Sequence, residues 1–125
     1  MHIIFGDAVQ HIPDSFTVLE LDTFYIAERN EEVTTYCVLE KIPLSEFSTL
    51  ERFKEAHQNL IKEYRLKNWS FCKQAIEVLV GHWAGELDSF YQALEQRIDE
   101  LIKNPPGDEW TGVVTPNSKA PQVAD

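Results

Sequence analysis

The residues best suited to chemistry in this chain are its four histidines, and their spacing matches no catalytic or metal-binding motif. They are His2, His11, His57 and His82. Two ligands on one helix face stand three or four residues apart, and no pair of these histidines does. His2, Asp7 and His11 could gather around a metal ion if the first strand turned back, but that spacing corresponds to no known ligand set. We therefore expect no metal site.

The other candidate groups have structural explanations. His57 stands in an apolar helical stripe, which favours a hydrogen-bonded interior side chain over a catalytic one. Cys37 and Cys72 lie in apolar segments, which favours buried free thiols in a reducing compartment over a disulfide or zinc site. Glu86 and Asp88 look like paired carboxylates, but acidic residues at a helix start are explained by the helix dipole.

Phosphate-binding and nucleophile motifs are missing from the sequence. The segment 6–8 (Gly-Asp-Ala) has the glycine pattern of neither a dinucleotide fold nor a P-loop. None of the serines stands in a nucleophile elbow, and local sequence places no base beside either cysteine. The sequence predicts no catalytic residue and no cofactor, although catalytic groups can converge in space from distant segments.

Composition limits the partners. The chain has 125 residues, is 43% hydrophobic and 26% charged, and carries a net charge of -10. That length suits one folded domain. The negative field repels nucleic acid and anionic lipid, so we expect neither as a partner; mimicry of nucleic acid is a less favoured alternative because the acidic residues are scattered. Without a signal peptide or a long apolar run, we expect a cytoplasmic protein.

The first third of the chain predicts β-structure. Ile3 to Phe5 is a short apolar run, and two longer runs rich in β-branched and aromatic residues, 16–26 and 33–39, flank a polar hexapeptide at 27–32. These runs predict a β-hairpin over residues 16–39. One face of its second strand carries Val33, Thr35, Cys37 and Leu39, and the other face is partly apolar too. We expect both faces to be covered, one of them by the rest of the chain or by a partner.

Two helices are predicted in the middle of the chain. Ser48 and Glu51 have capping-box spacing, which places a helix start there, and an apolar stripe continues to Tyr64. Asn68 is a competent N-cap for a second helix whose inner side carries Trp69, Cys72, Ala75, Ile76, Leu79, Val80 and Trp83. The stretch 64–76 is therefore predicted to be a helix-turn-helix joint.

A third helix follows a break bracketed by Gly81 and Gly85. Its apolar residues recur at helical spacing from Leu87 to Ile102, and the Pro-Pro-Gly sequence at 105–107 stops it. We expect Trp110 to dock back on the domain, because leaving that ring in water is costly. Residues 1–114 are thus predicted to form one α+β domain, and residues 115–125 a disordered tail.

Aromatic residues are concentrated around the joint and the later helices. Core packing explains most of them, but an aromatic face larger than a small domain can bury marks an interface. We therefore predict self-association or binding of a protein partner through the aromatic helical surface, with Tyr64, Trp69, Phe71, Trp83 and Trp110 as the interaction residues.

The order of these parts resembles a known family. A Tyr64-x4-Trp69 joint with Cys72 and Ile76 is similar to a tetratricopeptide-type unit, although the chain does not repeat it. A hairpin, such a joint, Arg97 on a last helix and the ending 105–113 (Pro-Pro-Gly-Asp-Glu-Trp-Thr-Gly-Val) together resemble the C-terminal region of bacterial class III adenylate cyclases.

That resemblance implies a cyclase tail without the catalytic part. The metal-binding, purine-selecting and transition-state residues of cyclases lie upstream of the region that this chain resembles, so no catalytic residue carries over. The polar tip at 27–32 also departs from the glycine-containing hairpin tip of the family. A protein of this kind is expected neither to bind ATP nor to turn it over.

The sequence as a whole predicts an α+β fold in which a small antiparallel sheet packs on a three-helix, tetratricopeptide-like unit. The predicted function is a non-catalytic interaction or regulatory module that self-associates. The alternative is a small-ligand-binding or enzymatic domain with its pocket between the sheet and the helices.

Overall fold

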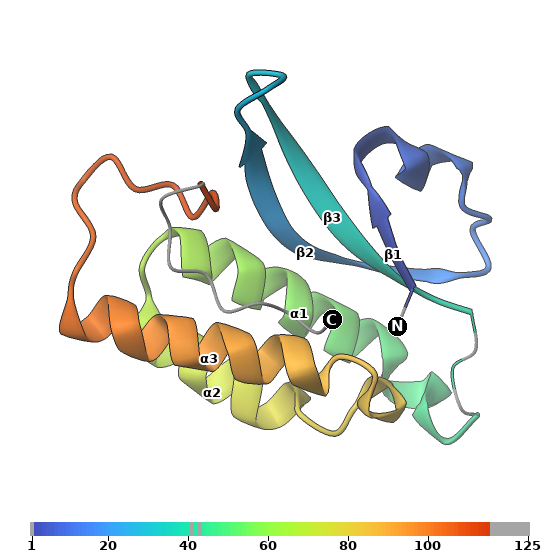
Figure 1. Ribbon diagram of the computed structural model, residues 1–125. Helices are drawn as coiled ribbons and strands as arrows, with labels where there is room; N and C mark the ends of the chain where they lie inside the picture. The colour runs from blue at the N-terminus through green and yellow to red at the C-terminus, as the bar shows by residue number, and fades with distance from the viewer. Residues whose placement is uncertain (1, 41, 43, 116–125) are drawn as a thin grey trace.

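The computed structural model describes residues 2–40, 42 and 44–115, and it confirms the α+β fold (Figure 1). A three-stranded antiparallel sheet lies against a layer of three helices. The strands are β1 (His2–Phe5), β2 (Thr17–Ile26) and β3 (Glu31–Leu39). The helices are α1 (Leu50–Arg65), α2 (Trp69–Leu79) and α3 (Asp88–Lys103). Shorter 3₁₀ turns are η1 (Gly6–His11), η2 (Leu44–Thr49) and η3 (Trp83–Gly85).

The predicted hairpin is the centre of the sheet. Strand β3 lies between β1 and β2 and pairs antiparallel with both. On the face that carries Val33, Thr35, Cys37 and Leu39, the last three are all at most 5% exposed, and Val38 on the other face is 4% exposed. A register shift between Glu20 and Thr23 inserts one extra residue into β2. Such a bulge bends a strand, and in Figure 1 the hairpin curves over the helices while its tip projects away from them.

The outer edge of β2 is covered by the chain's own C-terminal segment. That segment returns from the end of α3 to the hairpin (Figure 1). The amide of Tyr25 donates to the carbonyl of Val114 at 2.8 Å, and the amide of Val114 donates to the carbonyl of Thr23 at 2.8 Å. Val114 thereby forms a parallel bridge with Phe24. This contact covers part of an edge that would otherwise present unpaired main-chain groups.

The joint between α1 and α2 is a tight helix termination. Lys67 adopts a left-handed conformation with φ 64°. The amide of Asn68 donates to the carbonyl of Glu63 at 3.0 Å, and that of Lys67 to Tyr64 at 3.1 Å. This is the pattern of a Schellman motif, which satisfies the last carbonyls of a helix and usually has glycine at the left-handed position. The predicted helix-turn-helix over 64–76 is confirmed.

Two local predictions about helix ends are wrong. Helix α1 begins at Leu50 after Thr49, whose side chain makes no capping bond, because a 3₁₀ turn occupies 44–49 and places Ser48 before the helix instead of at its N-cap. Helix α2 ends at Leu79, so Trp83 belongs to η3 and not to α2. Gly81, at φ 90°, turns the chain there. Asn68 is at the N-cap position of α2 as predicted but makes no side-chain capping bond.

The core lies between the sheet and the helices. It is built from Leu19, Leu39, Leu60, Ile76, Leu79, Leu87, Leu94 and Ile98, each at most 2% exposed. Trp110 docks back as predicted, with its ring centroid 5.2 Å from that of Tyr64 and 5.6 Å from that of Trp69. Apart from Thr115, the predicted disordered tail lies outside the described residues.

Candidate functional site

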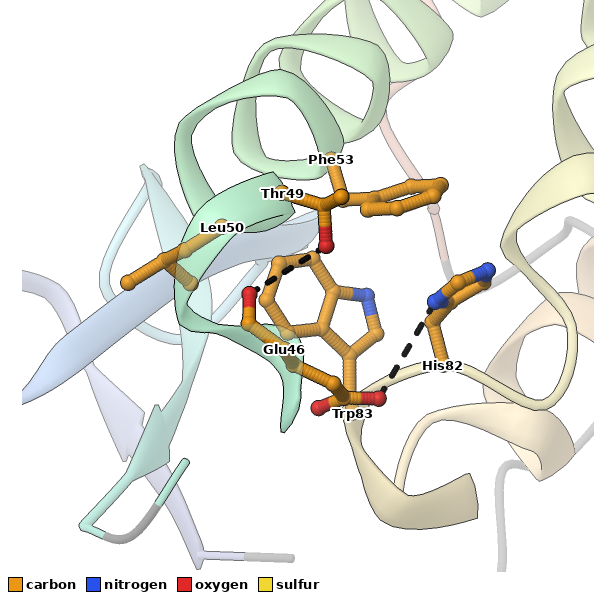
Figure 2. A pocket seen from close by; sticks show the side chains of 6 residues that line it. All are labelled: Glu46, Thr49, Leu50, Phe53, His82 and Trp83. Carbon is orange, nitrogen blue, oxygen red and sulfur yellow. Dashed lines mark hydrogen bonds and ion pairs between the residues drawn. The ribbon is translucent and has the colours of Figure 1, made fainter. Parts of the chain in front are cut away.

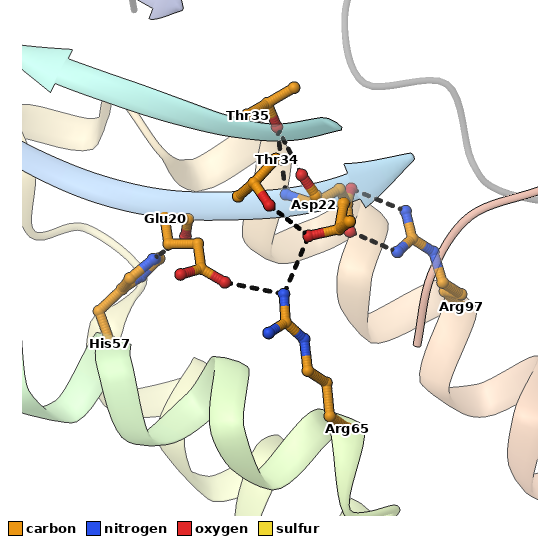
Figure 3. Close-up of polar contacts among 8 residues, drawn as sticks. Glu20, Asp22, Thr34, Thr35, His57, Arg65 and Arg97 are labelled. Carbon is orange, nitrogen blue, oxygen red and sulfur yellow. Dashed lines mark hydrogen bonds and ion pairs between the residues drawn. The ribbon is translucent and has the colours of Figure 1, made fainter. Parts of the chain in front are cut away.

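A buried ion pair joins the sheet to the last helix. Arg97 of α3 donates through Nη1 to Asp22 Oδ1 at 2.8 Å and through Nη2 to Asp22 Oδ2 at 3.2 Å (Figure 3). The two side chains are 9% and 8% exposed. Burial disfavours the charged guanidinium, but the hydrogen bonds and charge of Asp22 outweigh that effect and raise the pKa of Arg97. The guanidinium of Arg97 therefore stays charged and acts as a fixed link between α3 and the sheet, not as a proton donor.

The bulge in β2 places Asp22 for this pairing. The hydroxyl of Thr35 accepts from the amide of Asp22 at 3.2 Å and donates to the carbonyl of Asp22 at 2.9 Å. One hydroxyl thus satisfies both main-chain groups of a residue that the bulge removes from regular pairing (Figure 3). The phenol of Tyr64 lies 3.4 Å from Arg97 Nη1 as a further acceptor.

His57 is a fully bonded core histidine, as the sequence predicts. Its Nε2 donates to the carbonyl of Glu20 at 2.6 Å, which fixes the proton on that nitrogen. Its Nδ1 therefore accepts from the Tyr91 hydroxyl at 2.9 Å, and this hydroxyl accepts from Trp83 Nε1 at 3.0 Å. The ring is 0% exposed, and burial lowers the pKa of His57. Both ring nitrogens are engaged, so His57 has no free atom for a metal or a substrate.

A second, more exposed contact fastens α1 to the edge strand. Arg65 Nη2 donates to Glu20 Oε2 at 2.8 Å and to Thr23 Oγ1 at 3.1 Å (Figure 3). The Thr23 hydroxyl lies 2.8 Å from that of Thr34. Together with the Asp22–Arg97 pair, these bonds connect two strands and two helices, so they hold the sheet and the helices together.

A carboxylate and an imidazole come together at one end of α1, between η2 and η3 (Figure 2). Glu46 Oε1 lies 4.0 Å from His82 Nδ1, and the His82 ring stacks on Phe53 at 3.8 Å between centroids. Glu46 Oε2 is buried with no hydrogen-bond partner among the described residues. The adjoining cavity measures about 10 Å³. That space suits at most one water molecule.

The thiols and potential metal ligands offer no reactive centre in the part of the chain that the structure describes. Cys37 and Cys72 are buried free cysteines, and burial raises the pKa of their thiols to about 12 and about 11. Such thiols are protonated and unreactive at neutral pH. Within residues 2–40, 42 and 44–115, no group of three or more histidine, cysteine or carboxylate side chains could hold a metal ion.

A larger hollow lies at the far end of the hairpin. It measures about 350 Å³ and is lined by Phe5, Phe24, Tyr25, Ile26, Val33, Val114 and Thr115. Phe5 is 62% exposed there. The residues come from all three strands and from the returning segment, so only the folded chain assembles this apolar surface. Sequence reasoning missed it as a site, although the two-sided apolar character of the hairpin was the available signal.

The five predicted interaction residues have different environments. Tyr64 and Trp83 are 4% and 3% exposed and fill the core. Trp69 and Trp110 are partly buried and pack against that core. Phe71 is 38% exposed on α2, where Val78, 56% exposed, stands seven residues further along the same face. Of the predicted set, Phe71 offers the most accessible ring.

Comparison with known proteins gives no relative: no family model, curated protein or solved structure matches this chain. The resemblance to the C-terminal region of adenylate cyclases therefore stays a prediction. No helix within the described residues has the length and apolar character needed to cross a membrane.

Proposed function

We propose that this chain is a non-catalytic interaction module of the cytoplasm that associates with itself. The observation that carries the proposal is the apolar hollow at the end of the hairpin, with Phe5, 62% exposed, among the residues that line it. Contiguous exposed apolar surface is unfavourable in water and marks interaction sites in folded proteins.

The polar residues of the described region support a structural reading over a catalytic one. His57, Asp22 and Arg97 are the buried ionisable groups with the most developed bonding, and each is engaged with other parts of the fold. The space between sheet and helices is filled by the core side chains, Leu19, Leu39 and Leu60 among them. This packing disfavours the alternative of a ligand pocket at that place.

Two surfaces compete as the contact region. One is the hollow with Phe5, and the other is the exposed face of α2 with Phe71 and Val78. The hollow is the better candidate because it is concave and gathers side chains from several strands, whereas the α2 face offers two separate apolar residues. Burying the exposed part of one phenylalanine ring, about 100 Å², contributes roughly 2.5 kcal/mol.

Sedimentation velocity over a range of concentrations tests the proposal. We expect wild-type chain to associate and Phe5→Thr to raise the dissociation constant at least tenfold (~1.4 kcal/mol). The substitution places a β-branched residue, which suits a strand, at an exposed strand position, so folding is preserved. Phe71→Gln reports on the α2 face, and Leu44→Gln, at an 82% exposed leucine in η2, is the control for lost surface apolarity. Equal association of Phe5→Thr and wild type would exclude the hollow.

A further inference from the structure

The two edges of the sheet differ in how they are protected. The edge of β2 is bonded to Val114, whereas β1 pairs with β3 on one side and with no described strand on the other. Strand β1 has the sequence His-Ile-Ile-Phe, with Ile3 42% and Phe5 62% exposed. It contains none of the lysines, prolines or bulges that prevent edge strands from pairing with other chains.

Hydrogen bonds at the β2 edge fix the direction of the main-chain groups across the sheet. Thr23 and Tyr25 bond to Val114, so these main-chain groups point away from β3. The groups of Phe24, between them, therefore point toward β3, where its register partner is Val33. Val33 in turn directs its main-chain groups toward β2, because directly opposed residues of an antiparallel pair that face each other exchange both bonds.

The same alternation shows which groups of β1 are unpaired. Every second residue of β3 from Val33 onward, including Thr35 and Cys37, points its main-chain groups toward β2. Cys37 is the register partner of Ile3, and Thr35 is that of Phe5. The amides of Ile3 and Phe5 therefore point away from β3, toward the open edge, while His2 and Ile4 supply the bonds to β3.

We propose that β1 of a second copy pairs antiparallel with β1 about a twofold axis at Ile3. The amide of each Ile3 donates to the Ile3 carbonyl of the other copy, and the two sheets become one continuous sheet of six strands. This inference rests on the proposed self-association and names its geometry. A twofold contact needs a patch that is complementary to itself. An apolar strand edge meets that need when an outward residue at its centre, here Ile3, offers both a donor and an acceptor.

The distribution of charge favours contact with a second copy at this edge rather than at other parts of the hairpin. Two chains of net charge -10 repel each other, and the hairpin tip carries Glu28, Glu31 and Glu32. Strand β1 contains no carboxylate, so two copies can approach there without placing like charges in direct contact. Four residues a side are far fewer than the roughly 20–30 of a stable interface, so we expect a weak complex, with a dissociation constant of micromolar or above.

A proline substitution tests the main-chain pairing. Ile3→Pro removes the outward amide and leaves the bonds of His2 and Ile4 to β3 in place, and proline is tolerated on an edge strand whose N–H faces out. We expect Ile3→Pro to raise the dissociation constant at least tenfold and Ile3→Val, which keeps the amide, to change it less than threefold. Circular dichroism and thermal melting check that both variants fold. Unchanged association of folded Ile3→Pro would overturn the inference and leave the proposed function standing.

Hydrogen exchange of the unmodified chain provides a readout that needs no variant. We expect the amides of Ile3 and Phe5 to exchange rapidly in dilute solution and more slowly as the concentration rises, while those of His2 and Ile4 are protected throughout. Association without added protection at Ile3 would place the contact elsewhere and overturn the strand pairing. A wild-type chain that stays monomeric at every concentration would overturn both the pairing and the proposed function.

Discussion

Replacing Arg97 with methionine tests whether the buried ion pair holds the sheet to α3. Methionine keeps most of the apolar stem of arginine and removes its charge, which leaves the carboxylate of Asp22, only 8% exposed, without its cation. Breaking a buried pair from one side costs about 3–5 kcal/mol. A domain of this size has a free energy of unfolding of about 5–15 kcal/mol, so the loss is a large share of the total.

The assay is urea unfolding followed by circular dichroism, with a surface pair as the matched control. Lys73 Nζ lies 2.7 Å from Asp99 Oδ1, as close as the nearest contact between Arg97 and Asp22, but these side chains are 42% and 49% exposed. Lys73→Met should therefore change the free energy of unfolding far less than Arg97→Met does. An unchanged slope of unfolding free energy against urea would show that stability, and not the extent of unfolding, has changed.

Double substitution separates the value of the pair from the cost of breaking it. Asp22→Leu with Arg97→Met removes both buried charges, so the double variant should be more stable than Arg97→Met alone. The reasoning is refuted if Arg97→Met costs no more than Lys73→Met, because the carboxylate would then be reaching water or another cation.

Three further predictions concern the bulge, the core histidine and the returning segment. Thr35→Val keeps the shape but leaves the Asp22 amide and carbonyl without their partner, so it should cost about 1–3 kcal/mol in urea unfolding; a loss within error would contradict the bonding described. Burial lowers the pKa of His57 in the folded state, so the contribution of His57 to stability is complete above pH 6.5 and is lost as the pH falls below that value. The loss amounts to at most about 1.4 kcal/mol per pH unit. The free energy of unfolding, measured from pH 8 to 5, should show this slope in wild type and lack it in His57→Gln. Gly112→Ala should destabilise the fold by about 1–3 kcal/mol, since φ is 87° there and a Cβ would lie 3.0 Å from Arg65 Cγ. Gly107→Ala is the control and should be neutral, because a Cβ at Gly107 has open space around it. Equal melting temperatures for these two variants would mean that the segment is not docked as described.

Local patterns predict most of the elements. The hairpin is evident from β-branched and aromatic runs on either side of a polar turn, and α3 from apolar residues at helical spacing, because both signals depend on which side chains one face must bury. The capping prediction at Ser48 failed for a local reason: a 3₁₀ turn and a helix use the same residue types, and which one forms depends on what packs beneath them. Trp83 was wrongly assigned to the second helix because the apolar residues keep helical spacing past Gly81, although the helix itself ends at Leu79.

The site depends on contacts between distant residues, which the sequence only hints at. Asp22 and Arg97 are 75 residues apart. Each stands beside an apolar residue, Asp22 next to Leu21 and Arg97 next to Ile98. Other charged residues, such as Glu20 and Asp99, are equally close in sequence, so the local pattern does not single out the buried pair. For the hollow, the two-sided apolar character of the hairpin is the available signal, but it does not locate the site, because Phe5 and Val114 become neighbours of the hairpin only through the tertiary fold.

The mass of the unmodified chain in solution tests the central claim most directly. Sedimentation equilibrium from micromolar to millimolar concentration should give a weight-average mass that rises from 14.4 kDa toward that of a dimer, and the rise should be reduced in Phe5→Thr. A mass of 14.4 kDa at every concentration would contradict self-association, and with it the function proposed for the apolar end of the hairpin.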